Sequence, residues 1–331
     1  RFIMYERGER TPGFSQRIVD GWVSLRDVLA DGERRLATAG VPSPRTDAAI
    51  LASHVINVPR TRMLLQDEIT RDQRTQFEIL LSRRIARVPI QHLLGTASFR
   101  HIEVAVGPGV FVPRPETELV AEAAIAALMD APVEQRMAVE LCAGSAAMAI
   151  SIATEVPGVT MFAVEVDPAA LEWTRRNVDI HQPALVDNNS VVEVVAADAR
   201  TCAAPGGVLA DLKGRVSVVA VNPPYIPEDA QPREPEVRDH EPRIALFGGD
   251  DGLDVIRGVV MSAAHLLREG GLVVIEHADT QGEAGRSGSV PALLRDGETT
   301  GLWVEVTDHL DLTRRPRFTT ARRSGSHTYS G

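Results

Sequence analysis

The chain has 331 residues, a length that predicts two domains, and 44% of them are hydrophobic, which excludes a mainly disordered protein. No apolar run reaches the roughly 20 residues of a membrane-spanning helix, and residues 1–21 lack the apolar stretch of a secretory signal, so we expect a cytoplasmic protein with no membrane partner. The formal net charge of −10 disfavours direct binding to nucleic acid, which normally requires a basic surface.

The N-terminal part of the chain shows helical periodicity. Residues 1–21 have no clear period and are predicted to be a disordered extension. A first helix is expected after Ser24, a suitable N-cap residue, and further helices are expected up to Arg87. We therefore predict a small α-helical bundle domain over residues 22–95.

Residues 96–113 show a different pattern, with apolar residues at alternate positions on both sides of Gly107-Pro108-Gly109. Two short strands around a Gly/Pro turn fit this pattern. We predict a β-hairpin linker between the two domains.

Strand-like and helix-like segments alternate from residue 114 to residue 321. Such alternation predicts an α/β fold with a mostly parallel sheet covered by helices on both faces. The last two strands have no helix between them and are expected to pair antiparallel at one edge. The polar tail, residues 322–331, is predicted to be flexible. The expected strands are Met137–Leu141, Val159–Val164, Val191–Ala196, Val216–Val221, Leu272–Glu276, Leu302–Val306 and Arg317–Ala321, and the expected helices span 116–129, 146–155, 168–178, 253–268 and 290–296.

Small and acidic residues stand at the ends of three successive strands. The first strand runs into Glu140-Leu141-Cys142-Ala143-Gly144-Ser145-Ala146, a tight turn in which backbone N–H groups can approach a ligand closely. The second ends at Glu165, suited to accept from two ribose hydroxyls, and the third at Asp198, suited to accept from an adenine amine. Each feature alone is equally compatible with a loop glycine, a solvated carboxylate or a helix cap. Together, and without a dinucleotide or P-loop motif, they predict a nucleoside ligand that lacks a pyrophosphate, such as S-adenosylmethionine.

The fourth strand runs into Asn222-Pro223-Pro224-Tyr225. The two prolines stiffen the turn and remove two backbone donors. The Asn222 side-chain oxygen and the Pro223 carbonyl can then accept from one planar NH2 group, which Tyr225 stacks on or walls off. This pattern predicts methyl transfer by positioning and desolvation, without a covalent enzyme intermediate. The alternative is a structural Asn-Pro turn that closes a strand.

The sequence offers no metal site. Cys142 and Cys202 match no zinc-ligand spacing, and no two of the 9 histidines have the spacing of a helical metal site. We expect no bound metal ion.

Four motifs together carry a resemblance. Asn222-Pro223-Pro224-Tyr225 resembles the signature of methyltransferases that act on planar amine or amide nitrogens. The other three are more selective, and they are Arg87-Val88-Pro89-Ile90-Gln91-His92-Leu93-Leu94-Gly95, Val112-Pro113-Arg114-Pro115-Glu116-Thr117-Glu118 and Ala245-Leu246-Phe247-Gly248-Gly249-Asp250-Asp251-Gly252-Leu253. Over about residues 24–321 the chain is similar to the peptide chain release factor N5-glutamine methyltransferases, the HemK/PrmC family.

The resemblance implies a seven-stranded Rossmann-like class I S-adenosylmethionine-dependent methyltransferase domain over residues 114–321, behind an N-terminal domain that docks the substrate. It implies that the methyl acceptor is the glutamine side-chain amide of the Gly-Gly-Gln motif in bacterial peptide chain release factors. The cofactor-binding residues that it implies are Glu140, Cys142, Ala143, Gly144, Ser145 and Ala146 on the methionine side, Glu165 at the ribose, Asp198 and Ala199 at the adenine, and Asn222. The glutamine amide would be held by Asn222, Pro223, Pro224 and Tyr225, with Arg114 as a further substrate-binding residue.

The chain departs from the family pattern in the cofactor motifs. Family members usually have Asp at the positions of Glu140 and Glu165, and Gly at those of Cys142 and Ala146. A methyl group at Ala146 is expected either to crowd the cofactor or to demand a strained backbone.

Three alternatives stay open from the sequence. One is a non-catalytic release-factor-binding protein that has lost cofactor affinity, and another is a glutamine methyltransferase that acts on a ribosomal protein. The third is a DNA adenine amino-methyltransferase, which the acidic charge and the small helical N-terminal domain disfavour. Nothing in the sequence demands more than a monomer.

Overall fold

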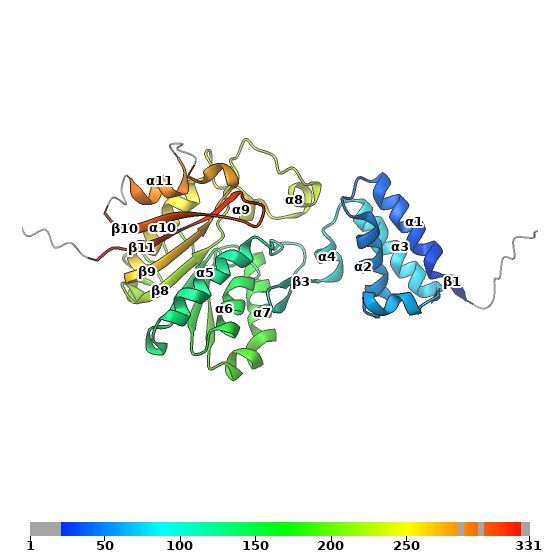
Figure 1. Ribbon diagram of the computed structural model, residues 1–331, viewed down its shortest axis with the longest axis horizontal. Coiled ribbons are helices and arrows are strands. Elements are labelled where there is room, and N and C mark those ends of the chain that lie inside the picture. Colours follow the sequence, from blue (N-terminus) through cyan, green and yellow to red (C-terminus); the bar gives the residue numbers. More distant parts are fainter. Residues whose placement is uncertain (1–20, 284–287, 297–300, 326–331) are drawn as a thin grey trace, which may run out of the picture. The chain divides into compact units, whose positions relative to one another are not determined.

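The structure, a computed structural model, describes residues 21–283, 288–296 and 301–325. It comprises two compact units, and the chain passes from the first to the second between Arg87 and Val88 (Figure 1). This division falls before the domain boundary expected at residue 95. The predicted N-terminal extension, apart from Gly21, and the chain after residue 325 lie outside the described residues.

The first unit packs three helices, which are α1 (Leu25–Thr38), α2 (Pro44–Ile56) and α3 (Arg71–Ile85), with the 3₁₀ turn η1 (Arg60–Leu65) between the last two. Capping residues start the first and third helices, because Ser24 accepts from the Asp27 N–H at 3.3 Å and Thr70 forms a capping box with Gln73. The unit also contains two short antiparallel strands outside the sequence prediction, β1 (Trp22–Ser24) and β2 (Glu68–Thr70). Alternation over three residues is too short to indicate a strand.

A buried ion pair joins α2 to α3 in this unit. Arg84 Nε lies 2.7 Å from Asp47 Oδ2, and the two side chains are only 7% and 10% exposed. Charges taken out of water are tolerated when they are paired and hydrogen-bonded. Each of these side chains therefore depends on the other.

We expect Asp47→Ala to lower the free energy of unfolding of the N-terminal unit by about 3–5 kcal/mol, because Arg84 stays buried without this carboxylate. The matched control is Asp31→Ala, which removes an exposed partner of Arg34 and Arg35 and should change stability by less than about 1 kcal/mol. Urea unfolding measures both. Equal changes in the two variants would show that the buried pair contributes no more than a surface pair.

The second unit begins with α4 (Ile90–Leu94) and a hairpin whose turn lies earlier than predicted. Arg100 forms the turn with φ of +50°, and its guanidinium is held 2.7 Å from Glu155. Gly107, expected in the turn, instead passes against Trp173, where a Cβ would lie 2.6 Å from the ring. Residues 110–112, expected to be the second strand, form none. The hairpin strands are β3 (Thr96–Phe99) and β4 (Ile102–Ala105).

A seven-stranded sheet with the order β10-β11-β9-β8-β5-β6-β7 forms the centre of the second unit. The strands from β9 to β7 run parallel, while β11 is antiparallel to β9 and β10 is antiparallel to β11. The predicted α/β class and the antiparallel pair at one edge are confirmed. The strands are β5 (Met137–Leu141), β6 (Thr160–Glu165), β7 (Val191–Ala196), β8 (Val216–Val221), β9 (Leu267–Glu276), β10 (Trp303–Leu310) and β11 (Pro316–Arg323).

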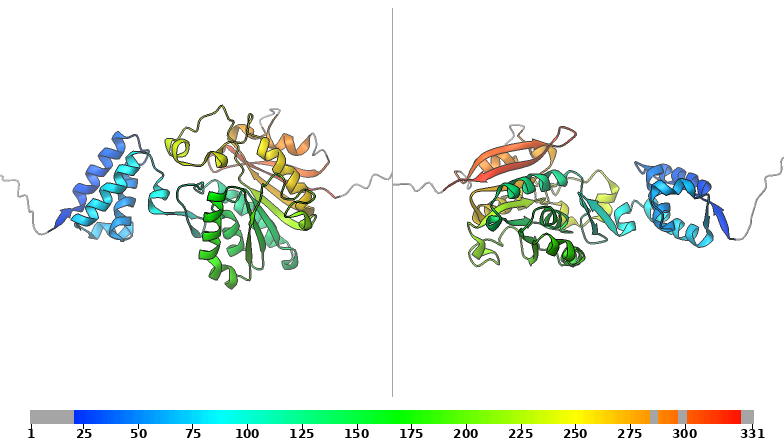
Figure 2. Two further views of the ribbon diagram at one scale, coloured as in Figure 1. Left: turned by 180° about the vertical axis from the view of Figure 1, so that it is seen from behind. Right: turned by 60° about the horizontal axis from the view of Figure 1, so that its bottom comes forward.

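Helices cover both faces of this sheet (Figure 2). One apolar layer contains residues of α5 (Thr117–Asp130), α6 (Ala147–Glu155) and α7 (Pro168–Asp187), and the other contains residues of α10 (Asp254–Leu266) and α11 (Val290–Arg295). Strand residues alternate between the layers, so that Ala220 packs on the α5 side and Val221 on the α10 side. This alternation also decides which face the residue after each strand points to.

Two helical features differ from the sequence prediction. Helix α7 continues past the expected end at residue 178 to Asp187, with Pro183 inside it. Two short helices occur where no helix was expected. The sequence could not predict them, because four to six residues cannot show a helical period. They are α8 (Pro235–His240) and α9 (Arg243–Leu246).

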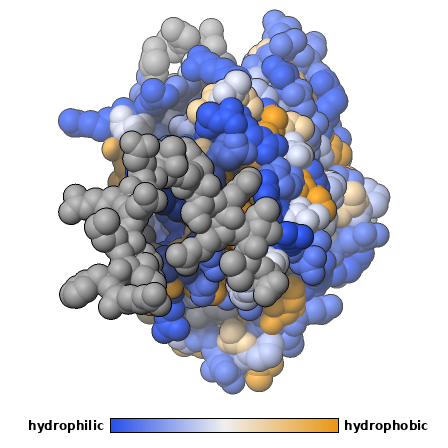
Figure 3. Space-filling view, turned by 90° about the vertical axis from the view of Figure 1, so that its right-hand side faces the viewer, coloured by the Kyte–Doolittle hydropathy of each residue, from blue (hydrophilic) through white to orange (hydrophobic). Residues whose placement is uncertain are grey.

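Among the described residues, no helix combines the length and the apolar character needed to cross a membrane. The face drawn in Figure 3 is mainly hydrophilic, and its hydrophobic residues form small separate groups.

Candidate active site

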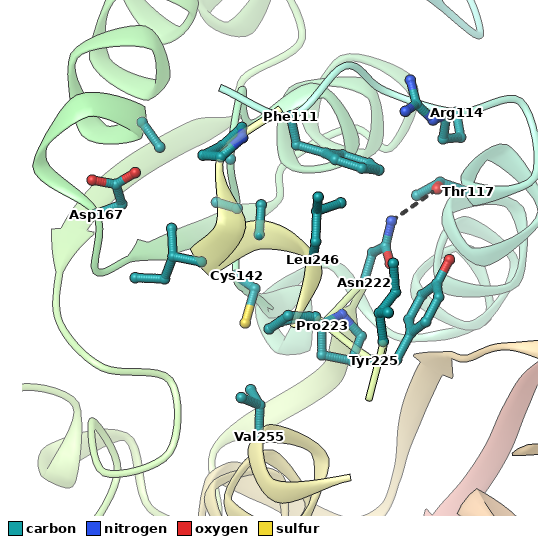
Figure 4. Close-up of a pocket in the computed structure, with 18 of the residues that line it drawn as sticks. Phe111, Arg114, Thr117, Cys142, Asp167, Asn222, Pro223, Tyr225, Leu246 and Val255 are labelled. Carbon is teal, nitrogen blue, oxygen red and sulfur yellow. Dashed lines mark hydrogen bonds between the residues drawn. The ribbon is translucent and has the colours of Figure 1, made fainter. Parts of the chain in front are cut away.

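A cavity of about 710 Å³ lies at the C-terminal ends of the central strands (Figure 4). β5 pairs with β6 on one side and with β8 on the other, so the strand order reverses beside β5. Ligands of open parallel sheets bind at such reversals. Every predicted site residue except Ala146 lines the cavity, namely Arg114, Glu140, Cys142, Ala143, Gly144, Ser145, Glu165, Asp198, Ala199, Asn222, Pro223, Pro224 and Tyr225.

Strand register brings these residues together from distant parts of the chain. Leu141 pairs with Val221 on one side and with Val164 on the other. The residues that follow, Cys142 and Asn222, therefore leave the sheet side by side. The predicted cofactor half and the predicted catalytic half form one site.

The turn from β5 into α6 has a left-handed backbone at three positions, with φ of +63° at Cys142, +55° at Gly144 and +61° at Ala146. For a residue other than glycine this conformation costs roughly 1–2 kcal/mol. The Ala146 side chain is fully buried and lies outside the cavity lining. Of the two consequences expected for Ala146, the structure shows the strained backbone and not the crowded ligand site.

Glu140, on β5, anchors the turn between β5 and α6. Its side chain is buried, and its Oε2 accepts from the Ala149 N–H of α6 at 2.9 Å. Burial raises the pKa of Glu140 well above its ordinary value, against a smaller lowering by that N–H. The carboxyl group ties the start of α6 to β5.

The Glu165 carboxylate is bound to the backbone around it. Oε1 accepts from the N–H groups of Val166 and Asp167, and Oε2 accepts from that of Gly144, each at 2.8 Å. A carboxylate offers about four lone-pair sites. Oε2 thus has room for one more donor, whereas the sequence predicted that Glu165 would take two ribose hydroxyls.

Asp198 is paired with Arg200, a residue absent from the sequence prediction. Arg200 Nη2 lies 2.6 Å from Asp198 Oδ2, and the Arg200 N–H lies 2.9 Å from Oδ1. The hydrogen bonds from Arg200 lower the pKa of Asp198, although partial burial opposes them. Both side chains line the cavity. An adenine amine would share this carboxylate with the guanidinium.

Thr117 orients the side-chain amide of Asn222. Asn222 Nδ2 donates to Thr117 Oγ1 at 3.2 Å (Figure 4), so Oδ1 is the acceptor that Asn222 offers to the cavity. Within the described residues, the Pro223 carbonyl makes no hydrogen bond. Burial, with a contribution from Glu276, raises the pKa of the Tyr225 phenol, which therefore stays neutral beside Asn222. Asn222 Oδ1 and the Pro223 carbonyl thus stay the two acceptors that the sequence predicts for a ligand.

The loop before α10 supports the back of the Asn222–Tyr225 turn. Gly248 and Gly252 approach the carbonyl oxygens of Pro224 and Tyr225 so closely that a Cβ would lie 2.6 and 2.3 Å away. Gln281 Nε2 donates to the carbonyls of Tyr225 and Gly252 at 3.2 and 3.3 Å. These glycines are therefore required by backbone packing on the turn.

Arg114 lines the cavity, but its guanidinium is already engaged. Nη2 lies 2.8 Å from both oxygens of Glu241, whose side chain is 1% exposed, and the group stacks over Phe111 at 4.6 Å. Burial raises the pKa of Glu241 although Arg114 opposes the shift. Arg114 thus fastens the segment that carries Glu241 to the chain before α5.

Sequence reasoning missed Thr117 and Gln281 as parts of this site. Thr117 lies inside a quoted motif, and Gln281 closely follows the end of β9, so strand-end position is the signal that could have found it. No group of three or more metal-ligating side chains is arranged to hold a metal ion within the described ranges.

We expect Ala146→Gly to change the affinity for the cofactor product S-adenosylhomocysteine by less than about threefold, because the methyl group lies outside the cavity. Relief of about 1 kcal/mol of backbone strain is offset by loss of about 0.8 kcal/mol of buried methyl, so stability should change little. Calorimetric titration and urea unfolding measure the two quantities. A large gain in affinity would show that Ala146 does obstruct the ligand.

We expect Glu165→Gln to weaken S-adenosylhomocysteine binding about 10–100-fold, because an amide cannot accept from all of the Val166, Asp167 and Gly144 N–H groups and from the ligand. Calorimetric titration measures the affinity. Glu193→Gln, an exposed Glu on β7 outside the cavity, is the matched control and should bind normally. Unchanged binding in Glu165→Gln would remove this residue from the cofactor site.

Known proteins match both units of the chain. A family model described as the PrmC N-terminal domain matches residues 27–95. A protein of Streptomyces coelicolor named release factor glutamine methyltransferase is 46% identical over 297 residues, which cover 89% of this chain and 97% of that protein. Proteins of the same name from Mycolicibacterium smegmatis and Deinococcus radiodurans are 43% and 35% identical, and the matches cover 90% and 92% of this chain and 98% and 100% of those proteins. With this identity over nearly the whole length of its relatives, the chain belongs to the release factor glutamine methyltransferase family.

Proposed function

We propose that this chain transfers a methyl group from S-adenosylmethionine to the side-chain amide nitrogen of the glutamine in the Gly-Gly-Gln motif of bacterial peptide chain release factors. The observation that carries the proposal is the pair of acceptors, Asn222 Oδ1 and the Pro223 carbonyl, at the cavity wall. Family membership supports the glutamine amide as the group that they hold.

The residues of the cavity fit the cofactor. Its volume of about 710 Å³ lies within the roughly 300–1,000 Å³ of small-molecule sites. Gly144 borders open space, because a Cβ built on it would meet nothing within 4 Å. Glu165 would hold a ribose hydroxyl, and Asp198 with Ala199 would border the adenine. Bound there, S-adenosylmethionine supplies an electrophilic methyl group on a sulfonium.

The residues of the chain hold the acceptor nitrogen in place. The NH2 group of the substrate glutamine has two hydrogens, and Asn222 Oδ1 and the Pro223 carbonyl can accept one each. These bonds fix the nitrogen in the cavity and increase its electron density. Tyr225 and the apolar lining exclude water. Catalysis consists of orientation and desolvation, which alone supply large rate enhancements when the reacting atoms are aligned.

The N-terminal region is proposed to dock the release factor. A family-specific domain matches there, and it supplies none of the residues that line the cavity. Such a domain adds binding energy away from the reacting atoms and so selects one protein substrate.

The other functions are less well supported. A DNA adenine methyltransferase needs a basic DNA-binding surface, whereas this chain has a net charge of −10. A degenerate binding protein was suggested by Ala146, whose side chain lies outside the cavity lining. A ribosomal-protein substrate is disfavoured because the relatives are named for release factors.

We expect the purified protein to transfer label from radiolabelled S-adenosylmethionine to a bacterial release factor, and not to the same factor with the glutamine of its Gly-Gly-Gln motif changed to alanine. Asn222→Ala should lower the rate at least about 100-fold, because one of the two acceptors is lost. The matched control is Asn188→Ala, which removes a side-chain hydrogen bond to the Ala153 carbonyl of α6, outside the cavity, and should leave the rate near that of the wild type. Binding of the factor without label transfer would contradict the catalytic proposal and favour the degenerate binding protein.

A further inference from the structure

A buried carboxyl group stands directly behind the catalytic turn. Glu276 is the last residue of β9 and is 1% exposed. β8 and β9 are parallel, with Val221 paired to Ile275, so the residues that follow, Asn222 and Glu276, lie next to each other. Val221 and Ile275 pack in the apolar layer that contains α10. Side chains alternate along a strand, so Asn222 and Glu276, which follow them, point to the opposite face, toward α5.

The Thr117 hydroxyl lies between these two side chains. Thr117 is the first residue of α5 and is 6% exposed. Its Oγ1 accepts from Asn222 Nδ2 at 3.2 Å, and the hydroxyl lies close enough to the Glu276 carboxyl to lower the pKa of that group. A hydroxyl has one hydrogen to donate. Since Asn222 supplies the hydrogen on its side, the Thr117 hydrogen is available to Glu276.

The charged groups around Glu276 oppose one another. Burial raises the pKa of Glu276 to about 7, while the Thr117 hydrogen bond, Arg317 and Arg114 lower it and Glu116 raises it. Tyr225, another titratable group close to Glu276, stays neutral because burial raises the pKa of its phenol. Glu276 is thus ionised above neutral pH and protonated below it.

One oxygen of this carboxyl has no structural use in the fold. In the described part of the chain, Glu276 Oε2 has no hydrogen-bond partner and no access to solvent. A buried, half-satisfied carboxyl destabilises a protein, and an apolar residue of similar size would avoid that loss. A role in the site explains why it is present.

We propose that Glu276 is a positioning residue that acts through Thr117. The carboxylate accepts the Thr117 hydrogen, which turns the Thr117 lone pair toward Asn222 Nδ2 and holds the Asn222 amide with Oδ1 toward the acceptor nitrogen. Without this chain the Asn222 amide can rotate and present its NH2 group, which repels the NH2 group of a substrate. The chain of hydrogen bonds is a property of the protein alone, whereas its catalytic consequence rests on the proposed function.

The direction of these bonds predicts a pH dependence. A protonated Glu276 can instead donate to Thr117 Oγ1. The Thr117 hydrogen is then no longer directed at Glu276, and the hydroxyl loses its fixed orientation. The turnover number should therefore rise with pH through about 7 as Glu276 ionises. Glu276→Gln still accepts from Thr117 but does not titrate, so its rate should vary less than about twofold between pH 6 and pH 8.

Thr117→Val removes the link while keeping the shape of the side chain. We expect it to lower kcat about 10–100-fold with unchanged affinity for S-adenosylhomocysteine, and Thr117→Ser to stay within about threefold of the wild type. The matched control is Thr154→Val, a partly buried Thr whose hydroxyl donates to carbonyls of its own helix α6 outside the cavity. Equal losses in Thr117→Val and Thr154→Val, or a pH limb that persists in Glu276→Gln, would overturn the proposal.

A measurement without the release factor separates this proposal from the proposed function. With asparagine labelled by ¹⁵N, the side-chain amide resonance of Asn222, assigned by its loss in Asn222→Ala, should shift as the pH passes through about 7. The shift should be absent in Glu276→Gln and in Thr117→Val. A protein that shows this shift but does not methylate the factor would contradict only the proposed function. A shift unchanged in both variants would overturn the role of Glu276, whether or not methylation occurs.

Discussion

The pairing of β5 with β8 is the constraint on which the site depends. These strands are far apart in the sequence, and their register sets Cys142 beside Asn222 and thereby joins the proposed cofactor loop, residues 142–146, to the Asn222–Tyr225 turn. A slip of one residue would move every side chain of β8 to the other face of the sheet. Asn222 would then point toward α10 and away from Thr117. A slipped arrangement would place this polar side chain in the apolar layer that contains α10, without its hydrogen bond to Thr117.

The motifs that surround the site are largely packing partners of one turn. Gly248 and Gly252 leave room for the carbonyls of Pro224 and Tyr225, and Gln281 binds the Tyr225 carbonyl. Arg114 and Glu241 fasten the segment that follows the turn. These contacts explain why residues with no chemistry of their own accompany the Asn-Pro-Pro-Tyr turn: the two acceptors are useful only if the backbone that carries them is rigid.

The proposed cofactor loop stores backbone strain in the same region. Cys142 and Ala146 adopt left-handed conformations that glycine would take without strain, and the loop is held by the contacts of Glu140 with Ala149 and of Glu165 with Gly144. Strained residues persist where their surroundings determine the conformation more strongly than local preference does. The longer side chain of Glu165 is part of this arrangement, because it reaches back to the backbone of its own loop and to Gly144.

The sequence by itself determined the α/β class and the bounds of β5, β7 and β8, and it predicted the Asn222–Tyr225 turn at the end of β8. These depend on apolar alternation, capping residues and proline, which act within a few residues of each other. Motifs also sufficed for the family, which the identity to its relatives confirms. Only the tertiary structure decided the position of Ala146 outside the cavity and the packing of Gly107 against Trp173. It also decided the links of Asn222 to Thr117 and of Arg114 to Glu241, which span 105 and 127 residues of chain. No local pattern encodes such contacts, because they form only when the packing of the sheet and its helices brings distant residues together.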